Sequence, residues 1–426
     1  MGLWEELGWR GMVHQCTDPE LPAKLAAAPF TVYTGFDASA DSLHAGHLAP
    51  IMGLRRFQRA GHRPIALLGG TTTMIGDPSG RATERPLLPR EQIAANLEGL
   101  RHQLERFLDF SPGPAQAVMA DNTDWLVPMP LVDFLRDIGK HFTVNAMLGK
   151  ESVRSRLTER EQGISYTEFS YMLLQAYDFL HLFDSEGCRL QLGGSDQWGN
   201  ITAGVDLIRR VRRAEAYGLT WPLLTRSDGT KFGKSEGANV WLDPRRTSPY
   251  RFFQYWLSTP DDDVATYLRL LTDLEATDVA ELARRPRDAQ HRLAYEVTTW
   301  VHGREEADRA RRASEALFGG GALAELDGAL LAEVFAEAPS TVVPRRELEG
   351  DGLSLVDLLV RTGLASSKSA ARTAVAQGGV YLNDERQGDP DRTLERGDLL
   401  GDRWIVARRG RKTYHVVRFE DRAGRE

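Results

Sequence analysis

Two histidines in the segment DSLHAGHLAP, residues 41–50, are spaced to act on one ligand. His44 and His47 flank a glycine just before an amphipathic stretch. Three interpretations are open: a metal pair, a pair with a purely structural role, and a nucleotide-binding turn. Zinc would require further ligands at tetrahedral spacing, and the surrounding sequence offers no Cys/His cluster. A helix N-terminus instead provides N–H donors and a favourable dipole for phosphate, to which imidazole donors would add.

A second group of candidate residues lies in SDGTKFGKSEG, residues 227–237, where Lys231 and Lys234 are three apart in a polar, glycine-rich loop. Taken alone, this segment fits an ordinary surface loop equally well. A lysine ammonium is a mobile point charge suited to binding phosphate. The occurrence of this loop together with the upstream histidines makes a functional role for both groups more favourable than for either alone.

Strand-like segments precede the chemically interesting residues. FTVYTGFDAS (30–39) is rich in β-branched and aromatic residues, and RPIALLGGTTTMIGD (63–77) and CRLQLGGSDQWGN (188–200) are apolar runs that end in glycines. Residues 91–108 and 131–148 have helical patterns. The strand–helix–strand spacing predicts an α/β fold with a Rossmann-type doubly wound parallel sheet. Ligands of such sheets bind at the carboxyl ends of the strands.

The second half of the chain has a different organisation. Residues 245–318 are helical in pattern, and 319–348 begin with three glycines and close on prolines, as a connector would. Two short helices, a glycine turn and a strand are expected after it. No internal repeat is evident.

Composition limits the function classes. The chain has 426 residues, of which 42% are apolar and 27% charged, as in soluble globular proteins, and no stretch is long enough for a membrane span. Cys16 and Cys188 are far apart, and the first residues do not resemble a secretory signal, so a cytoplasmic location is expected. A net charge of −7 argues against a wholly cationic nucleic-acid binder, although residues 351–426 carry a small basic excess.

The motifs resemble those of a known class of enzymes. HAGH is similar to the HIGH signature of class I aminoacyl-tRNA synthetases, with Ala45 in place of Ile, and KFGKS is similar to their KMSKS signature. Further stretches, YTGFDAS, GGTTTMIGDPSGR, YTEFSYMLLQAYDF and GGSDQWGN, narrow the resemblance to the bacterial tyrosyl-tRNA synthetase family over nearly the whole chain.

This resemblance implies a tyrosine–tRNA ligase that activates L-tyrosine with ATP and then transfers the tyrosyl group to the 3′ end of tRNA(Tyr). ATP is expected as a substrate, with Mg²⁺, and no tightly bound cofactor. The implied assembly is a homodimer. The expected domains are a Rossmann-type catalytic domain (1–225) with a dimer-forming insertion around 120–160, a signature lysine loop and helical domain (226–320), a connector (321–350) and a small α+β S4-like RNA-binding domain (351–426).

The resemblance also assigns roles to individual residues. The implied catalytic residues, which act on the phosphates, are His44, His47, Lys231, Lys234, Arg81 and Arg85. The implied tyrosine-binding residues are Tyr33, Asp77, Tyr171, Gln175, Asp178 and Gln197. The implied ATP-binding residues are the two histidines, the two lysines, Gly35, Asp37, Ser39, Gly194 and Asp196. The candidate RNA-binding residues are Lys368, Arg372, Arg408 and Arg409, and no metal ligand is expected.

Two features add to these assignments. Tyr171, Gln175 and Asp178 are spaced i, i+4 and i+7, so a helix places them on one face. Tyr33 and Asp178 are expected to bracket the substrate hydroxyl, which phenylalanine lacks. The chain departs from many relatives at Arg81, where lysine is common, and at Thr34, where cysteine is frequent.

Several alternatives remain open at this point. A tryptophanyl-tRNA synthetase would share the architecture, and an RNA-binding paralogue would keep the fold without catalysis. A metabolic enzyme that adenylates a tyrosine analogue, or a specialised duplicate of the synthetase, would share the motifs. The arginines between 209 and 213 fit either a contact with the tRNA acceptor arm or an ordinary solvated helix face.

Overall fold

The computed structural model describes residues 1–79, 87–150, 153–154, 163–223, 234–235, 238–317, 323, 326, 328–336, 338–410 and 413–421. The chain divides into two compact units, which are described separately. The first comprises Met1–Thr247 and Tyr255–Leu293, and the second comprises Ser248–Gln254 and Ala294–Glu426. Helices α12 (Pro249–Leu257) and α15 (Pro286–His302) each contain residues of both units.

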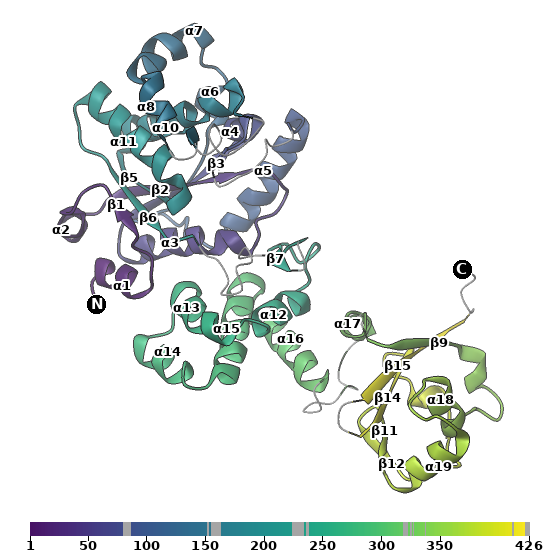
Figure 1. Cartoon of the computed structure of the whole chain (residues 1–426). Helices are drawn as coiled ribbons and strands as arrows, with labels where there is room; N and C mark the ends of the chain where they lie inside the picture. The colour runs from purple at the N-terminus through teal and green to yellow at the C-terminus, as the bar shows by residue number, and fades with distance from the viewer. Residues whose placement is uncertain are drawn as a thin grey trace. The chain divides into compact units, whose positions relative to one another are not determined.

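The first unit is built on a six-stranded sheet with the strand order β1-β6-β5-β2-β3-β4 (Figure 1). The strands are β1 (Gln15–Cys16), β2 (Thr31–Asp37), β3 (Arg63–Gly69), β4 (Val118–Asp121), β5 (Cys188–Gly194) and β6 (Tyr217–Trp221). All neighbouring pairs from β6 to β4 are parallel, and only the short β1 is antiparallel to its neighbour. The predicted α/β, Rossmann-type parallel sheet is confirmed.

Strand β2 marks the point where the strand order reverses. The chain moves from β2 to β3 on one side, while the later strand β5 pairs with β2 on the other; Tyr33 is thus opposite both Ile65 and Gln191. A crevice opens outside the carboxyl ends of the strands at such a switch point, because the connections leave in opposite directions. Strands β2 and β5 therefore position the most favourable ligand site of this sheet.

The helices of the first unit connect and cover these strands. They are α1 (Leu3–Trp9), α2 (Leu21–Ala27), α3 (Leu48–Arg59), α4 (Gly70–Ile75), α5 (Arg90–Leu104), α6 (Thr123–Leu126), α7 (Leu131–Asp133), α8 (Val144–Leu148), α10 (Tyr166–Glu186), α11 (Trp198–Arg212), α13 (Asp261–Leu271) and α14 (Ala276–Leu282). The longest, α10, begins at the N-cap Ser165, whose hydroxyl accepts the N–H of Glu168, and ends at Gly187 in the left-handed conformation (φ 63°).

The structure differs from the helix expected over 131–148. This stretch is α7, a π-helical turn over Phe134–Ile138, a 3₁₀ turn over Gly139–His141 and then α8. Phe142 and Thr143 are extended between the last two, and the Thr143 hydroxyl caps α8 by accepting the N–H of Ala146. A local cap therefore starts a new helix where the apolar pattern alone runs on.

A buried arginine fixes the far end of α3. Arg56 is 2% exposed and donates to the carbonyls of Leu270 (3.2 Å) and Thr272 (2.9 Å) at the end of α13. Glu6 provides its carboxylate partner at 3.0 Å. A buried guanidinium persists only with such partners, so these contacts restrain the helix that follows the two histidines.

The second unit contains a five-stranded sheet with the order β12-β11-β14-β15-β9. The strands are β9 (Ser340–Pro344), β11 (Val380–Leu382), β12 (Glu385–Gln387), β14 (Trp404–Arg409) and β15 (Thr413–Glu420), and a separate pair joins β10 (Leu353–Ser354) to β13 (Thr393–Leu394). Helices α18 (Leu355–Arg361) and α19 (Lys368–Ala376) share a core with the sheet. The predicted order of two short helices, a glycine turn and a strand is confirmed.

The stretch expected to be a connector, 321–350, contributes structure to this second unit. It holds α17 (Gly328–Val334) and β9, and β9 pairs in parallel with the last strand, β15. Leu330 and Leu331 pack in an apolar cluster with Trp404 of β14. The C-terminal sheet thus includes residues before 351. The helix α16 (Arg304–Leu317) precedes this region, and the described part of the chain contains no helix with the length and apolarity of a membrane span.

Candidate active site

A cavity of about 960 Å³ lies at the carboxyl ends of β2 and β5. It is lined by thirteen of the residues predicted from sequence: Tyr33, Gly35, Asp37, Ser39, His44, His47, Asp77, Tyr171, Gln175, Asp178, Gly194, Asp196 and Gln197. Arg81, Arg85 and Lys231 lie outside the described residues. The structure thus brings together segments that are up to about 160 residues apart in the chain, at the switch point where a ligand is expected.

The two histidines form a turn at the start of α3. Residues Ala45–His47 are a 3₁₀ turn that runs directly into α3, so the predicted helix start is confirmed. The Nδ1 atom of His44 accepts the N–H of Gly46, and the Nδ1 atom of His47 accepts the N–H of His44, both at 3.1 Å. A neutral ring with Nδ1 as acceptor carries its proton on Nε2. The pair therefore has a structural capping role and also retains a donor atom on each ring.

No metal centre accompanies these histidines within the described segments. Their Nδ1 atoms are engaged by backbone N–H groups, and the described residues contain no group of three or more His, Cys, Asp or Glu side chains arranged to hold an ion. The rings lie 4.0 Å apart and beside the cavity.

The segment that follows the signature lysine loop contacts this histidine turn. Lys234 begins β7 (Lys234–Ser235), and its backbone pairs with Asn239 of β8 (Ala238–Asn239), which lines the cavity. Two residues further, Trp241 forms a backbone bridge with His44, and their rings lie 6.0 Å apart in an edge-on arrangement. Backbone pairing therefore brings the strand that contains Lys234 to the wall of the cavity that holds the histidines.

One end of the cavity is a buried polar pocket. Asp178 is 1% exposed and accepts hydrogen bonds from Trp125 Nε1 (2.7 Å) and Asn122 Nδ2 (3.0 Å). Burial raises the pKa of the Asp178 carboxyl to about 7, against the opposing effect of these two donors. The hydroxyl of Tyr33 is buried and has no hydrogen-bond partner among the described residues. A ligand hydroxyl could donate to Asp178 and accept from Tyr33, which would satisfy both.

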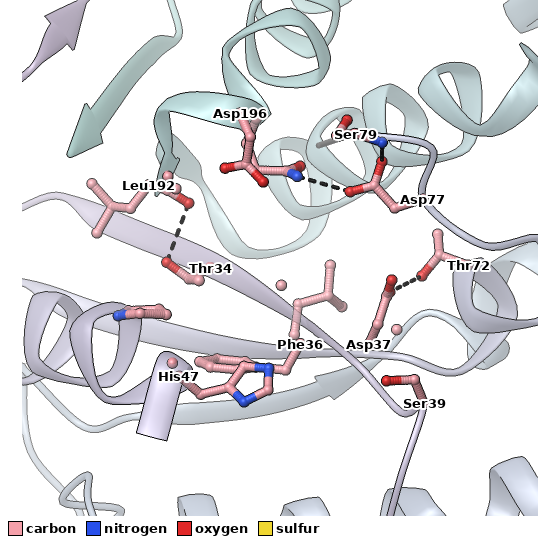
Figure 2. Close-up of a pocket in the computed structure, with 18 of the residues that line it drawn as sticks. Thr34, Phe36, Asp37, Ser39, His47, Thr72, Asp77, Ser79, Leu192 and Asp196 are labelled. Atoms are coloured by element: carbon pink, nitrogen blue, oxygen red, sulfur yellow. Dashed lines mark hydrogen bonds between the residues drawn. The ribbon is translucent and has the colours of Figure 1, made fainter. Parts of the chain in front are cut away.

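A second polar network holds the middle of the cavity. Gln197 donates to Asp77 Oδ2 at 2.8 Å, while its Oε1 accepts from Gln175 at 3.3 Å. The other oxygen of Asp77 accepts the N–H of Ser79 (Figure 2). Asn200 also donates to Gln197, at 3.2 Å. This network presents a carboxylate and amide oxygens to the cavity, a set that would attract a cationic ligand group.

At the carboxyl ends of β2 and β5, hydrogen bonds hold the side chains in place and leave no room for a side chain at Gly194. Asp37 accepts a hydrogen bond from Thr72, and Thr34 donates to the carbonyl of Leu192 in β5 at 3.3 Å (Figure 2). A Cβ atom on Gly194 would lie 2.6 Å from a carboxylate oxygen of Asp196, so a side chain there would displace this carboxylate. Burial and the charge of Asp77 raise the pKa of Asp196.

Some cavity residues were not found from the sequence. Asn122, which follows β4, and Gln191 of β5 line the cavity, and the buried side-chain oxygen of Gln191 has no partner among the described residues. Trp125 does not line the cavity itself but donates to Asp178, which does. Asn122 follows the carboxyl end of a parallel strand, as the residues recognised in β2 and β5 do, and this position was an available signal. Trp125 and Gln191 offered no comparable signal, because their contacts depend on how helices and strands pack.

The basic residues predicted to contact RNA are on the second unit, each with an internal partner. Lys368 pairs with Asp357 at 2.6 Å, and Arg372 pairs with Asp391. Arg408 lies over the ring of Tyr381, 4.2 Å from its centroid, and Arg409 donates to the carbonyl of Leu364 at 2.8 Å. In the first unit, Arg209 pairs with Asp206 and Arg212 with Asp184. These pairs are compatible with both interpretations of the basic residues.

The sequence matches two protein-family models. The family model "tRNA synthetases class I (W and Y)" matches residues 25–319, and the model "Tyrosine--tRNA ligase SYY-like C-terminal domain" matches residues 333–417. The chain belongs to the class I tRNA synthetases of the tryptophan and tyrosine type.

Individual relatives narrow this assignment. The tyrosine–tRNA ligase of Roseiflexus castenholzii is 55% identical over 97% of this chain and 99% of its own length. That of Geobacillus stearothermophilus is 50% identical over 98% and 100%. A C-terminally truncated Aspergillus nidulans mitochondrial tyrosyl-tRNA synthetase of known structure superposes with a TM-score of 0.68 at 32% identity, over 74% of this chain and 94% of that one. Within its class, the chain belongs to the tyrosine–tRNA ligase family.

Proposed function

We propose that the chain activates L-tyrosine with ATP, which yields tyrosyl-adenylate and pyrophosphate, and then transfers the tyrosyl group to the 3′ end of tRNA(Tyr). The observation that carries this proposal is the polar end of the cavity. The buried Asp178 carboxyl requires a donor, and the Tyr33 hydroxyl, which has no partner among the described residues, requires an acceptor; a phenolic hydroxyl provides both. An indole, the side chain of tryptophan, has a donor only.

The proposed mechanism needs no protein nucleophile. The carboxylate of tyrosine attacks the α-phosphorus of ATP, the bond to the leaving pyrophosphate breaks, and the enzyme contributes positioning and stabilisation of charge. In the second step the terminal ribose hydroxyl of the tRNA attacks the carbonyl of the adenylate, and AMP leaves. ATP enters as its Mg²⁺ complex, with the metal as part of the substrate.

The cavity residues divide into three proposed groups. His44 and His47 donate from Nε2 to the phosphates, and the lysines of the signature loop with Arg81 and Arg85 close over the pyrophosphate. Asp37, Ser39, Gly35, Gly194 and Asp196 hold the nucleoside. Asp77, Tyr171, Gln175 and Gln197 hold the ammonium and carboxylate of the amino acid, for which the network around Asp77 is suited.

The test of this function is ATP–pyrophosphate exchange by the purified protein, run with each of the twenty amino acids. Tyrosine alone should support rapid exchange, and charging of tRNA(Tyr) should follow. Exchange with tryptophan instead would favour the related synthetase. Binding of tRNA without exchange by any amino acid would favour a paralogue that has lost catalysis.

The first prediction concerns pH. Because burial raises the pKa of Asp178 to about 7, this carboxyl becomes protonated as the pH falls through that value and is then a poorer acceptor for a phenol. Nearby Asp37 and Asp121 favour the protonated form, and the hydrogen bonds from Asn122 and Trp125 oppose it. We expect kcat/KM for tyrosine to fall below pH 7 by about tenfold per pH unit. The pH profile of kcat/KM for phenylalanine should lack this fall at low pH. Identical profiles for the two amino acids would contradict the assignment of Asp178 as the acceptor of the substrate hydroxyl.

We also propose that the protein is a homodimer. Large apolar side chains are exposed within the stretch 120–160: Val127, Leu131, Val132, Leu135, Val144 and Leu148, of which Leu131 is 71% exposed. A cluster of this kind on the surface is typical of an interface. The short helices α7 and α8 present several of these residues.

The second prediction tests this dimer. Leu131→Asp should place an unpaired charge in the interface and raise the dissociation constant of the dimer at least about tenfold, equivalent to about 1.4 kcal/mol. Leu87→Asp is the matched control, since Leu87 is 70% exposed outside this stretch. Sedimentation over a range of concentrations measures the change. Equal behaviour of the two variants would remove these residues from the interface.

We further propose that residues 1–225 and 226–320 form the catalytic and helical parts of the protein and that the protein is cytoplasmic. The proposed RNA-binding module comprises residues 351–426 together with β9, which belongs to the same sheet. The third prediction concerns RNA. The double substitution Lys368→Glu and Arg372→Glu on α19 should leave pyrophosphate exchange unchanged and lower kcat/KM for tRNA in the charging reaction. The slope of the logarithm of tRNA affinity against the logarithm of salt concentration should become smaller by about one per lost phosphate contact. Arg285→Glu, in the first unit, is the control. Unaltered charging at every salt concentration would exclude this helix from RNA binding.

A further inference from the structure

Helix α10, which lines the polar end of the cavity, has a further aromatic side chain about one turn beyond its cavity residues. Tyr171, Gln175 and Asp178 of α10 line the cavity, and His181 follows three residues after Asp178. The imidazole of His181 lies almost parallel to the indole of Trp125, with ring centroids 4.3 Å apart and an interplanar angle of 15°. The same indole donates its Nε1–H to Asp178 Oδ1 at 2.7 Å.

These contacts make the direction of one hydrogen bond depend on a stacked ring. The indole N–H lies in the plane of its ring, so any tilt of Trp125 turns the donor away from Asp178. Hydrogen bonds weaken steeply as their angle departs from linearity. Trp125 is on the short helix α6, which has one turn and little support of its own. The flat face of His181 restrains this tilt.

We infer that His181 is a positioning residue for tyrosine specificity, which acts by holding the Trp125 indole against the Asp178 carboxyl. This inference rests on the proposed function, because it concerns the group that receives the substrate hydroxyl. The role requires a flat ring of this size and no charge. Phenylalanine at this position should therefore preserve it, whereas a residue that fills space without a flat face should not.

The inference also predicts the direction of a pH effect. The Asp178 carboxyl is faced by Asp37 of β2 and Asp121 of β4, which raise its pKa, and by the donors of Asn122 and Trp125, which lower it. Weakening the hydrogen bond from Trp125 to Asp178 removes part of what lowers the pKa of Asp178, so this pKa should rise further. The acid limb of the tyrosine profile should then move to higher pH.

The charge state of the His181 imidazole is distinct from its stacking on Trp125. Burial lowers the pKa of this imidazole, Asp184 and Glu186 of its own helix act in the opposite direction, and the ring of Tyr177 lies 6.3 Å from it. A role for the charged imidazole would be lost in the phenylalanine variant. The comparison of variants therefore separates stacking from titration.

The experiment compares His181→Ala, His181→Leu and His181→Phe with the wild type and with the control His102→Ala, at a histidine whose side chain is 84% exposed. Exchange is measured with tyrosine and with phenylalanine across the pH range around 7. We expect H181A and H181L to lower kcat/KM for tyrosine about two- to tenfold, the range of a stacked aromatic pair. The kcat/KM for phenylalanine and the KM for ATP should stay unchanged, and H181F should restore the tyrosine value and the position of the acid limb.

Three results would overturn the inference. One is a ratio of kcat/KM for tyrosine to kcat/KM for phenylalanine, and an acid limb of the tyrosine profile, that are unchanged in H181L. Another is an equal loss of kcat/KM for both amino acids together with weaker use of ATP, as a general loss of folding would give. The third is failure of H181F to restore the ratio. If H181A does not fold, H181L and H181F decide the question. Absence of tyrosine-dependent exchange in the wild type would instead refute the proposed function.

Discussion

Asp178→Asn should lower kcat/KM for tyrosine by roughly 5- to 150-fold, the equivalent of about 1–3 kcal/mol for a buried group left without its partner. Each carboxylate oxygen already accepts one hydrogen bond, from Trp125 and from Asn122. An amide would turn its NH₂ group toward one of these two donors. It would also lose the charge that the phenolic hydrogen bond prefers.

The same substitution should leave kcat/KM for phenylalanine nearly unchanged, because phenylalanine has no hydroxyl to place there. The ratio of the two values, measured by pyrophosphate exchange, is therefore the decisive quantity. Asp184→Asn is a matched control on the same helix, at a carboxylate that forms a surface ion pair with Arg212 at 2.7 Å. A ratio in D178N equal to that of the control would mean that the hydroxyl is recognised elsewhere.

Gly99→Ala should reduce both stability and the use of ATP. A Cβ atom at Gly99 of α5 would lie 2.0 Å from the carbonyl oxygen of Asp41, a backbone atom that cannot rotate away. Asp41 belongs to the segment that leads into His44, and two side chains of α5 hold this segment: Asn96 donates to the carbonyl of Ala38, and Gln103 accepts the N–H of Leu43. The added methyl must therefore push the segment away from its anchors.

The expected change in the free energy of unfolding of Gly99→Ala is the difference between two opposing effects. Alanine favours a helix over glycine by about 1 kcal/mol, whereas overpacking against fixed atoms costs about 1–3 kcal/mol. A contact this short belongs at the upper end, so we expect a net loss of about 1–2 kcal/mol. Thermal unfolding and the KM for ATP measure the two consequences. Gly8→Ala is the control, since nothing lies within 4 Å of its Cβ position. If G99A melts at or above the temperature of G8A, the segment yields more easily than the geometry implies.

Much of this site follows from local features of the sequence. A strand that ends in polar and glycine residues, a helix that begins at HAGH, and the i, i+4, i+7 spacing of Tyr171, Gln175 and Asp178 are all properties of short segments. Backbone geometry converts them into positions directly: parallel strands share one carboxyl edge, and a helix aligns residues at these intervals. The predicted cavity residues in β2, β5 and α10 therefore lie on one cavity.

Local patterns were insufficient where the outcome depends on competing interactions. The apolar stretch 131–148 predicted one helix, and the cap at Thr143 divides it. The segment 321–350 has the composition of a connector, yet its strand β9 pairs with β15 some 70 residues later. Pairing of that kind depends on an available strand edge elsewhere in the chain, and composition does not report it.

The amino-acid sequence by itself determined the α/β fold, the histidine turn and the residues at the strand ends, because each depends on backbone geometry over a few residues. It also indicated the family, through the resemblance of its motifs. Only the tertiary structure decided which groups meet Asp178 and how Trp241 reaches His44. His181 and Trp125 are more than fifty residues apart in the chain, and their stacking exists because α6 and α10 meet at the Asp178 carboxylate. Such contacts arise from the packing of the whole unit, which no short segment encodes.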